Sequence, residues 1–144
     1  MYILKDYLGK EIKGIKRFLN IISVDRFKKH LEECYSNINL SEPYSDIVTN
    51  RCRQSIGYVT SELIKKGYED YIYKVYVCVG YVNNNWHCWL YYNDYFIDMT
   101  YCQFDSSFPE ILIIKASAAK KKGILNSCTE YPLFKWLEKE DEEN

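Results

Sequence analysis

The chain has 144 residues, 47% of them hydrophobic, and a formal net charge of −1 with a pI near 6.1. This length is close to the usual size of one domain, and this apolar share is enough for one core, so no second domain is expected. A nearly neutral chain lacks the positive surface that nucleic acids attract, so no nucleic-acid partner is expected despite the short basic run from Lys120 to Lys122.

The start of the chain lacks the apolar segment of a secretory signal, because Lys5, Lys10 and Lys13 interrupt it. No stretch approaches the roughly 20 apolar residues of a membrane helix. We therefore expect a cytoplasmic protein with no membrane partner.

The six cysteines are widely spaced and are expected to be free thiols in a reducing compartment. No C-x-x-C pair occurs, so no metal site is predicted, although four possible ligands lie close together in the sequence (Cys78, His87, Cys88 and Cys102). No glycine-rich phosphate loop occurs either, and no cofactor is expected.

In chain order, the first predicted elements are helices. Apolar spacing predicts an amphipathic helix from about Ile3 to Leu19, and Ser23 can cap a second helix from Val24 to Cys34. A loop is predicted from Ser36 to Asn50, with Pro43 inside it.

A further helix is predicted from about Arg51 to Lys66, with Thr49 or Asn50 as its cap and Gly67 at its end. Cys52 then lies in the first turn. Free backbone N–H groups and the helix dipole favour an anion there, which lowers the pKa of a thiol.

Arg51 and Arg53 are expected to add positive charge on either side of this thiol. The alternative is an inert core cysteine, because Cys52 shares its helical spacing with apolar residues (Ile56, Val59 and Leu63). The spacing alone leaves both interpretations open.

Strands are predicted at 72–81, 86–92 and 95–99, followed by an apolar run at 111–114 and a short helix from Tyr131 to Glu140. Helices that precede antiparallel strands predict an α+β domain, with the Cys52 helix packed on the sheet. The many tyrosines of this region suit either a peptide groove or ordinary half-exposed strands.

The pair Asn93-Asp94 suits a two-residue hairpin turn between two of these strands. Such a turn pairs Tyr92 with Tyr95, and continuing that register makes His87 and Asp98 diagonal neighbours on one face. Diagonal neighbours lie about 7–8 Å apart at the backbone, a gap that an imidazole and a carboxylate can close. The residues therefore fit a Cys-His-Asp triad, in which a carboxylate orients the base that activates a thiol.

These residues also lie in three motifs: Cys52-Arg53-Gln54-Ser55, His87-Cys88-Trp89 and Ile97-Asp98-Met99-Thr100 with Gln103-Phe104. The motifs resemble those of the transglutaminase-like branch of the papain-like cysteine enzymes. That branch is similar in having C-x-x-S on a helix that ends in glycine, an H-A-W strand and a following D-x-T. The resemblance covers residues 50 to 104; Cys88 replaces the usual small residue and Met99 the common proline, and both changes leave the triad in place.

The resemblance implies that Cys52 is the nucleophile, His87 the general base and acid, and Asp98 the orienting carboxylate. It also implies one papain-like domain over residues 1–144. The N-terminal helices and loop would occupy 1–49, the catalytic core 50–104, and a C-terminal strand, helix and acidic tail 105–144.

The expected partner is a protein or peptide whose amide bond forms a thioester with the thiol. Trp89, Asn50 and Gln103 are predicted to contact it, and the last two are also candidate oxyanion donors beside the Cys52 backbone N–H. Water as acceptor gives a peptidase, amidase or deamidase, which we expect because so small a domain leaves little room for a separate acceptor site. The alternatives are a transglutaminase, and an inactive papain-like module or a phage or pathogen effector.

Overall fold

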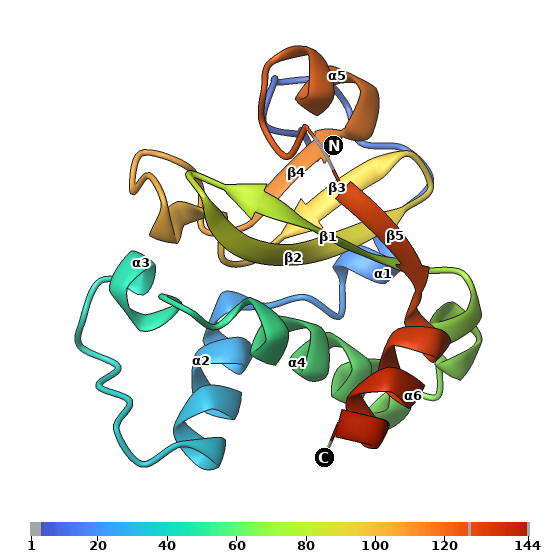
Figure 1. The fold of residues 1–144 in the computed structure, drawn as a ribbon. Helices are drawn as coiled ribbons and strands as arrows, with labels where there is room; N and C mark the ends of the chain where they lie inside the picture. Colours follow the sequence, from blue (N-terminus) through green and yellow to red (C-terminus); the bar gives the residue numbers. More distant parts are fainter. Residues whose placement is uncertain (1–3, 127, 144) are drawn as a thin grey trace.

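The structure, a computed structural model, describes residues 4–126 and 128–143 and is an α+β domain, as predicted (Figure 1). Within these residues, a five-stranded antiparallel sheet has the order β4-β3-β2-β1-β5. Its strands are Tyr76–Val82 (β1), Asn85–Tyr92 (β2), Tyr95–Asp98 (β3), Leu112–Lys115 (β4) and Cys128–Pro132 (β5).

Helices cover both faces of the sheet (Figure 1). Helices α2, α4 and α6 lie on one face, and α5 and the N-terminal segment lie on the other. The helix bounds are Lys16–Leu19 (α1), Val24–Cys34 (α2), Tyr44–Ile47 (α3), Cys52–Lys65 (α4), Ala116–Lys121 (α5) and Leu133–Glu143 (α6), with 3-10 helices at Glu69–Tyr73 (η1) and Tyr101–Gln103 (η2). No helix in 4–126 or 128–143 has the length and apolar character to span a membrane.

The alternation of side chains along β2 divides the apolar residues between two cores. Cys88 and Leu90 point into the core on the α4 side, together with Cys52 and other buried residues of that helix. Trp89 belongs to the core on the opposite side, with Cys78, Phe96, Leu112 and Ile114. Neighbouring side chains of β2 therefore point to opposite faces of the sheet, because side chains alternate along a strand.

The predicted helix from Ile3 to Leu19 is wrong over its described residues before Lys16. The Asp6 carboxylate accepts N–H bonds from Leu8 and Lys10, both at 2.9 Å, and Gly9 has a φ of 78°. These local bonds and the left-handed glycine turn the chain back on itself, so that Lys5 bridges Glu11. The buried positions in the second half of the segment were identified correctly (Ile12, Ile15, Phe18 and Leu19).

The other elements follow the predictions more closely. Helix α2 has the predicted bounds, and the Ser23 side chain accepts from the Arg26 backbone N–H at 3.2 Å. Strand β1 begins later than predicted because Glu69–Tyr73 forms η1, and β5 was not predicted. The predicted C-terminal helix is present as α6.

Candidate active site

Cys52 is the first residue of α4 and is 7% exposed. The helix begins after Arg51, and no side chain caps it. The prediction that Thr49 or Asn50 is the cap is wrong, because the Thr49 hydroxyl donates to the Ser45 carbonyl at 3.1 Å and Asn50 has a φ of 60°. The first N–H groups of α4 therefore have no side-chain acceptor and can stabilise an anion at Cys52.

His87 and Asp98 form a buried pair. The His87 Nε2–H group donates to Asp98 Oδ2 at 2.6 Å, and the two residues are 0% and 2% exposed. The predicted hairpin that brings them together is confirmed: Asn93 and Asp94 have φ values of 48° and 76°, and Tyr92 pairs with Tyr95. The strand register therefore places the imidazole within direct reach of the carboxylate.

Thr100 fixes the orientation of Asp98. The Thr100 backbone N–H donates to Asp98 Oδ1 at 2.8 Å, and the Thr100 hydroxyl lies 3.4 Å from the same oxygen. Both carboxylate oxygens are therefore engaged, one by Thr100 and one by His87. Thr100 had no predicted role, although an Asp that accepts from the backbone N–H two residues later is a common local turn.

The remaining nitrogen of the His87 ring, Nδ1, is buried and has no hydrogen-bond partner of standard geometry. Besides Asp98, the ionisable group that interacts with this ring is the Cys52 thiol. The arrangement therefore gives one ring nitrogen to the carboxylate and leaves the other for the thiol.

The charges of the site favour a thiolate and an imidazolium. A hydrogen bond with the Cys88 side chain and, after it, the interaction with His87 lower the pKa of Cys52 to about 5, against the effect of burial. Burial lowers the pKa of His87, but Asp98 and, after it, Cys52 together outweigh burial and raise that pKa to about 9. Between these two values the resting site holds an ion pair.

Aromatic rings enclose the imidazole. Trp89 stacks on His87 with ring centroids 5.6 Å apart, and the Phe104 ring meets it edge-on at 5.0 Å. Trp89 is 1% exposed, so its contact in the structure is with the base, and its predicted contact with substrate stays a prediction. Phe104 had no predicted role, because a contact between two separate segments leaves no local pattern in the sequence.

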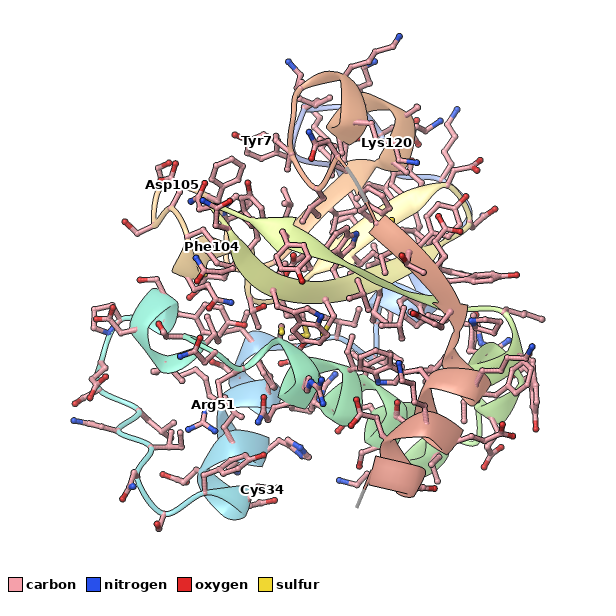
Figure 2. The ribbon with its side chains drawn as sticks, viewed as in Figure 1. Tyr7, Cys34, Arg51, Phe104, Asp105 and Lys120 are labelled. Carbon is pink, nitrogen blue, oxygen red and sulfur yellow. The ribbon has the colours of Figure 1, made fainter. Side chains whose placement is uncertain are left out.

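A groove of about 540 Å³ lies beside the site. Figure 2 shows Phe104 and Asp105, two of its residues, at the same end of the sheet. The other lining residues come from α3 and the η2 segment (Pro43, Ser45, Asp46, Cys102, Gln103 and Ser106). Gln103 is held in place because its Oε1 accepts the Asn50 backbone N–H at 2.9 Å. Of the two predicted polar contact residues, Gln103 therefore lines a space that a substrate can enter, and Asn50 is bonded to Gln103.

The arginines expected to flank the thiol have other contacts. The Arg51 guanidinium lies 4.4 Å from the centre of the Tyr35 ring. The Arg53 guanidinium lies 4.6 Å from the Trp86 ring, and its Nη1 is 3.4 Å from a Glu140 carboxylate oxygen. Both guanidinium groups thus make cation–π contacts with aromatic rings, which are common for arginine.

A group of possible metal ligands differs from the one considered from the sequence. Among the described residues, Cys78, Cys128 and Glu130 place their ligand atoms within 4.8 Å of one another. This group lies on β1 and β5 and shares only Cys78 with the earlier set. Neither Cys52 nor His87 belongs to it.

The structure thus brings Cys52, His87 and Asp98 to one place, with Gln103 and Asn50 beside them. Comparison with protein-family models, with curated proteins and with solved structures finds no significant match to this chain. What the site can do chemically therefore rests on its own geometry.

Alkylation of Cys52 by iodoacetamide is expected to be half-maximal near pH 5, because the thiolate is the reactive form and exists above the thiol pKa. Burial raises the pKa of Cys102 to about 11, so this thiol, which is also buried, serves as the internal comparison. The rates are measured by peptide mass spectrometry from about pH 4 to about pH 9, across the ordinary range of thiol pKa values. A Cys52 midpoint above pH 8 would contradict the ion pair.

Proposed function

We propose that the chain is a cysteine-dependent acyl-transfer enzyme of the transglutaminase-like branch of the papain-like fold, acting on amide or peptide bonds. The observation that carries the proposal is the buried 2.6 Å bond between His87 and Asp98, which leaves His87 Nδ1 for the Cys52 thiol. The placement of the nucleophile at a helix start, under the strand that carries the base, supports it as well. Such a set of groups both activates a thiol and returns a proton to a leaving group.

Acylation begins when the Cys52 thiolate attacks the carbonyl carbon of the substrate. Negative charge then develops on the carbonyl oxygen, and we assign the Cys52 backbone N–H and the Gln103 side-chain amide as its donors. Because Gln103 Oε1 accepts from Asn50, its Nε2 is the end that can donate. The His87 imidazolium gives its Nδ1 proton to the departing amine, and a thioester remains on Cys52.

Deacylation reverses these roles. Neutral His87 takes a proton from a water molecule, whose oxygen attacks the thioester and releases the Cys52 thiolate. Asp98 stabilises the imidazolium that forms in this step. An amine in place of water would give a transamidation product, and we favour hydrolysis because a chain of 144 residues leaves little room for a separate acceptor site.

The substrate we propose is a protein or an extended peptide. The groove beside Gln103 and Phe104 is open at the surface and has room for several side chains. A peptide in that groove would pass next to the start of α4, where the thiol lies.

The proposal is tested by incubating the protein with a diverse peptide mixture in heavy-oxygen water, with and without a primary amine. Mass spectrometry then separates the reactions: hydrolysis adds heavy oxygen to a new carboxylate, and transamidation adds the amine. Intact-mass analysis after an acid quench should also detect the acyl group on Cys52. Products that form equally with Cys52 blocked by iodoacetamide would refute the proposal.

The alternative is a binding module that retained the fold without turnover. The burial of the site favours it, because His87 is 0% and Cys52 only 7% exposed. A fast, low-pKa reaction of Cys52 with iodoacetamide would exclude an inert thiol, whereas a Cys52 no more reactive than Cys102 would support the binding module.

A further inference from the structure

Three side chains with metal-binding atoms meet on one face of the sheet, outside the proposed active site. The Cys78 and Cys128 sulfurs and a Glu130 carboxylate oxygen all lie within 4.8 Å of one another. The strand register accounts for this, because Cys78 on β1 pairs directly with Glu130 on β5, and Cys128 lies two residues before Glu130 on the same strand. Residues that are paired or two apart point to the same face, so the sheet itself brings the three donors together.

The face that carries these donors is the one that α5 covers. Cys78 is 0% exposed and belongs to the core that also holds Ala116 and Ala119 of α5. Cys128 is half-buried against the same core, and Glu130 is exposed. The three donors therefore lead from the surface to the interior, which gives a metal ion a path of entry past Glu130.

The distances between the donors suit a small divalent cation. In a tetrahedral zinc site, bonds of about 2.3 Å to sulfur and about 2.1 Å to oxygen place the donor atoms about 3.6–3.8 Å apart. Donors that already lie within 4.8 Å of one another can reach this spacing by small rotations of their side chains.

A disulfide between the two cysteines fits the strands less well. Cys78 pairs with Glu130 while Cys128 pairs with Gly80, so the two cysteines are diagonal neighbours. Diagonal neighbours lie about 7–8 Å apart at the backbone, whereas a disulfide usually needs Cα atoms within about 6.8 Å of each other. A shared metal ion spans the gap that a direct S–S bond would strain.

We propose that Cys78, Cys128 and Glu130 bind a zinc ion, which fixes the edge strand β5 to β1. Two thiolates and one carboxylate are suitable zinc ligands, and a water molecule would complete the tetrahedron. Binding releases the thiol protons to solvent, since the thiolate is the form that ligates the metal. This site is independent of the proposed function, because none of its ligands belongs to the triad.

The charges around the donors are consistent with a bound cation. Two thiolates and a carboxylate would repel one another, and a divalent ion reduces their combined charge to −1. Lys120 of α5, the helix over this face, interacts electrostatically with both sulfurs and offsets the remaining charge (Figure 2). Burial raises the pKa of both Cys78 and Cys128, so the cation is the group that makes their thiolates stable in the fold.

The test is a titration of the full chain with Zn²⁺ by calorimetry, after removal of metal with a chelator and reduction with a phosphine. In wild type we expect one equivalent of bound zinc, and a rise in Tm of about 5–10 °C when free zinc is about a hundred times Kd. Cys128→Ser should weaken binding at least about 100-fold and Glu130→Gln at least about tenfold. With Co²⁺ as the probe, the thiolate charge-transfer absorption of wild type should fall in Cys128→Ser.

Cys102→Ser is the matched control, because it makes the same change at a buried thiol outside the group. Cys52→Ser tests whether the thiol of the proposed active site captures the ion instead, and both variants should bind zinc like wild type. The variants at half-buried Cys128 and exposed Glu130 keep the test decisive even if a change at fully buried Cys78 prevents folding. Zinc binding that Cys52→Ser abolishes and Cys128→Ser leaves unchanged would overturn the proposal, and so would the lack of a one-equivalent transition in wild type.

Discussion

Replacing Cys52 by Ser is expected to lower turnover of an amide substrate by about 10⁴-fold or more, because removal of a catalytic nucleophile leaves only the binding and oxyanion contributions. The hydroxyl of Ser has a far higher pKa than the Cys52 thiol, so His87 would have to remove its proton during attack. The site is arranged for the opposite case, in which the proton already resides on the imidazole. Turnover is measured on the peptide identified in the heavy-oxygen experiment.

Cys34→Ser is the control for this substitution, because it makes the same chemical change at an exposed thiol on α2. Its turnover should equal that of wild type. Thermal unfolding of both variants shows whether the fold is kept. Near-normal turnover by folded Cys52→Ser would mean that another group is the nucleophile.

The hairpin that carries His87 and Asp98 could be predicted because its determinants are local. A two-residue turn at Asn93-Asp94 fixes the register of β2 and β3, and the period of a strand then decides which side chains share a face. The position of Cys52 in the first turn of α4 could also be predicted from local sequence, because it follows from helical spacing.

The N-terminal segment shows where such reasoning fails. Apolar residues recur there with helical spacing and are buried, but Asp6 bonds the backbone of Leu8 and Lys10 and competes with a helix. Burial could be predicted from the pattern, whereas the backbone path depended on one side chain and the glycines near it. Helical spacing is thus stronger evidence for which residues are buried than for the element that buries them.

Contacts between distant segments could not be predicted. The contacts of Phe104 with His87 and of Gln103 with Asn50 each join residues whose spacing in the sequence follows neither a helical nor a strand period. They depend on how α4 and η2 pack at the end of the sheet. The pairing of His87 with Asp98 could therefore be predicted from local patterns, while the contacts around this pair became visible only in three dimensions.

Replacing Asp98 by Asn is expected to lower turnover by about 10³–10⁴-fold, since a neutral amide neither stabilises the imidazolium nor fixes the ring tautomer. Asp98 is the group that raises the pKa of His87 against the effect of burial. Without its charge, only Cys52 opposes the effect of burial, and the His87 pKa should fall below about 9. The imidazolium would then lose its proton at a lower pH, and the Cys52 thiolate would lose its counter-ion over that range.

The fall in the His87 pKa can be measured directly by following the His87 ring protons by NMR as the pH is changed. In wild type the imidazolium should persist until the pH rises through about 9, whereas in Asp98→Asn the ring should lose its proton at a clearly lower pH. Asp94→Asn, in the hairpin turn where a φ of 76° suits asparagine, makes the same change outside the triad and should leave the His87 titration as in wild type. An unchanged His87 titration in folded Asp98→Asn would show that Asp98 does not set the charge of the base, because the 2.6 Å bond would then have no electrostatic consequence.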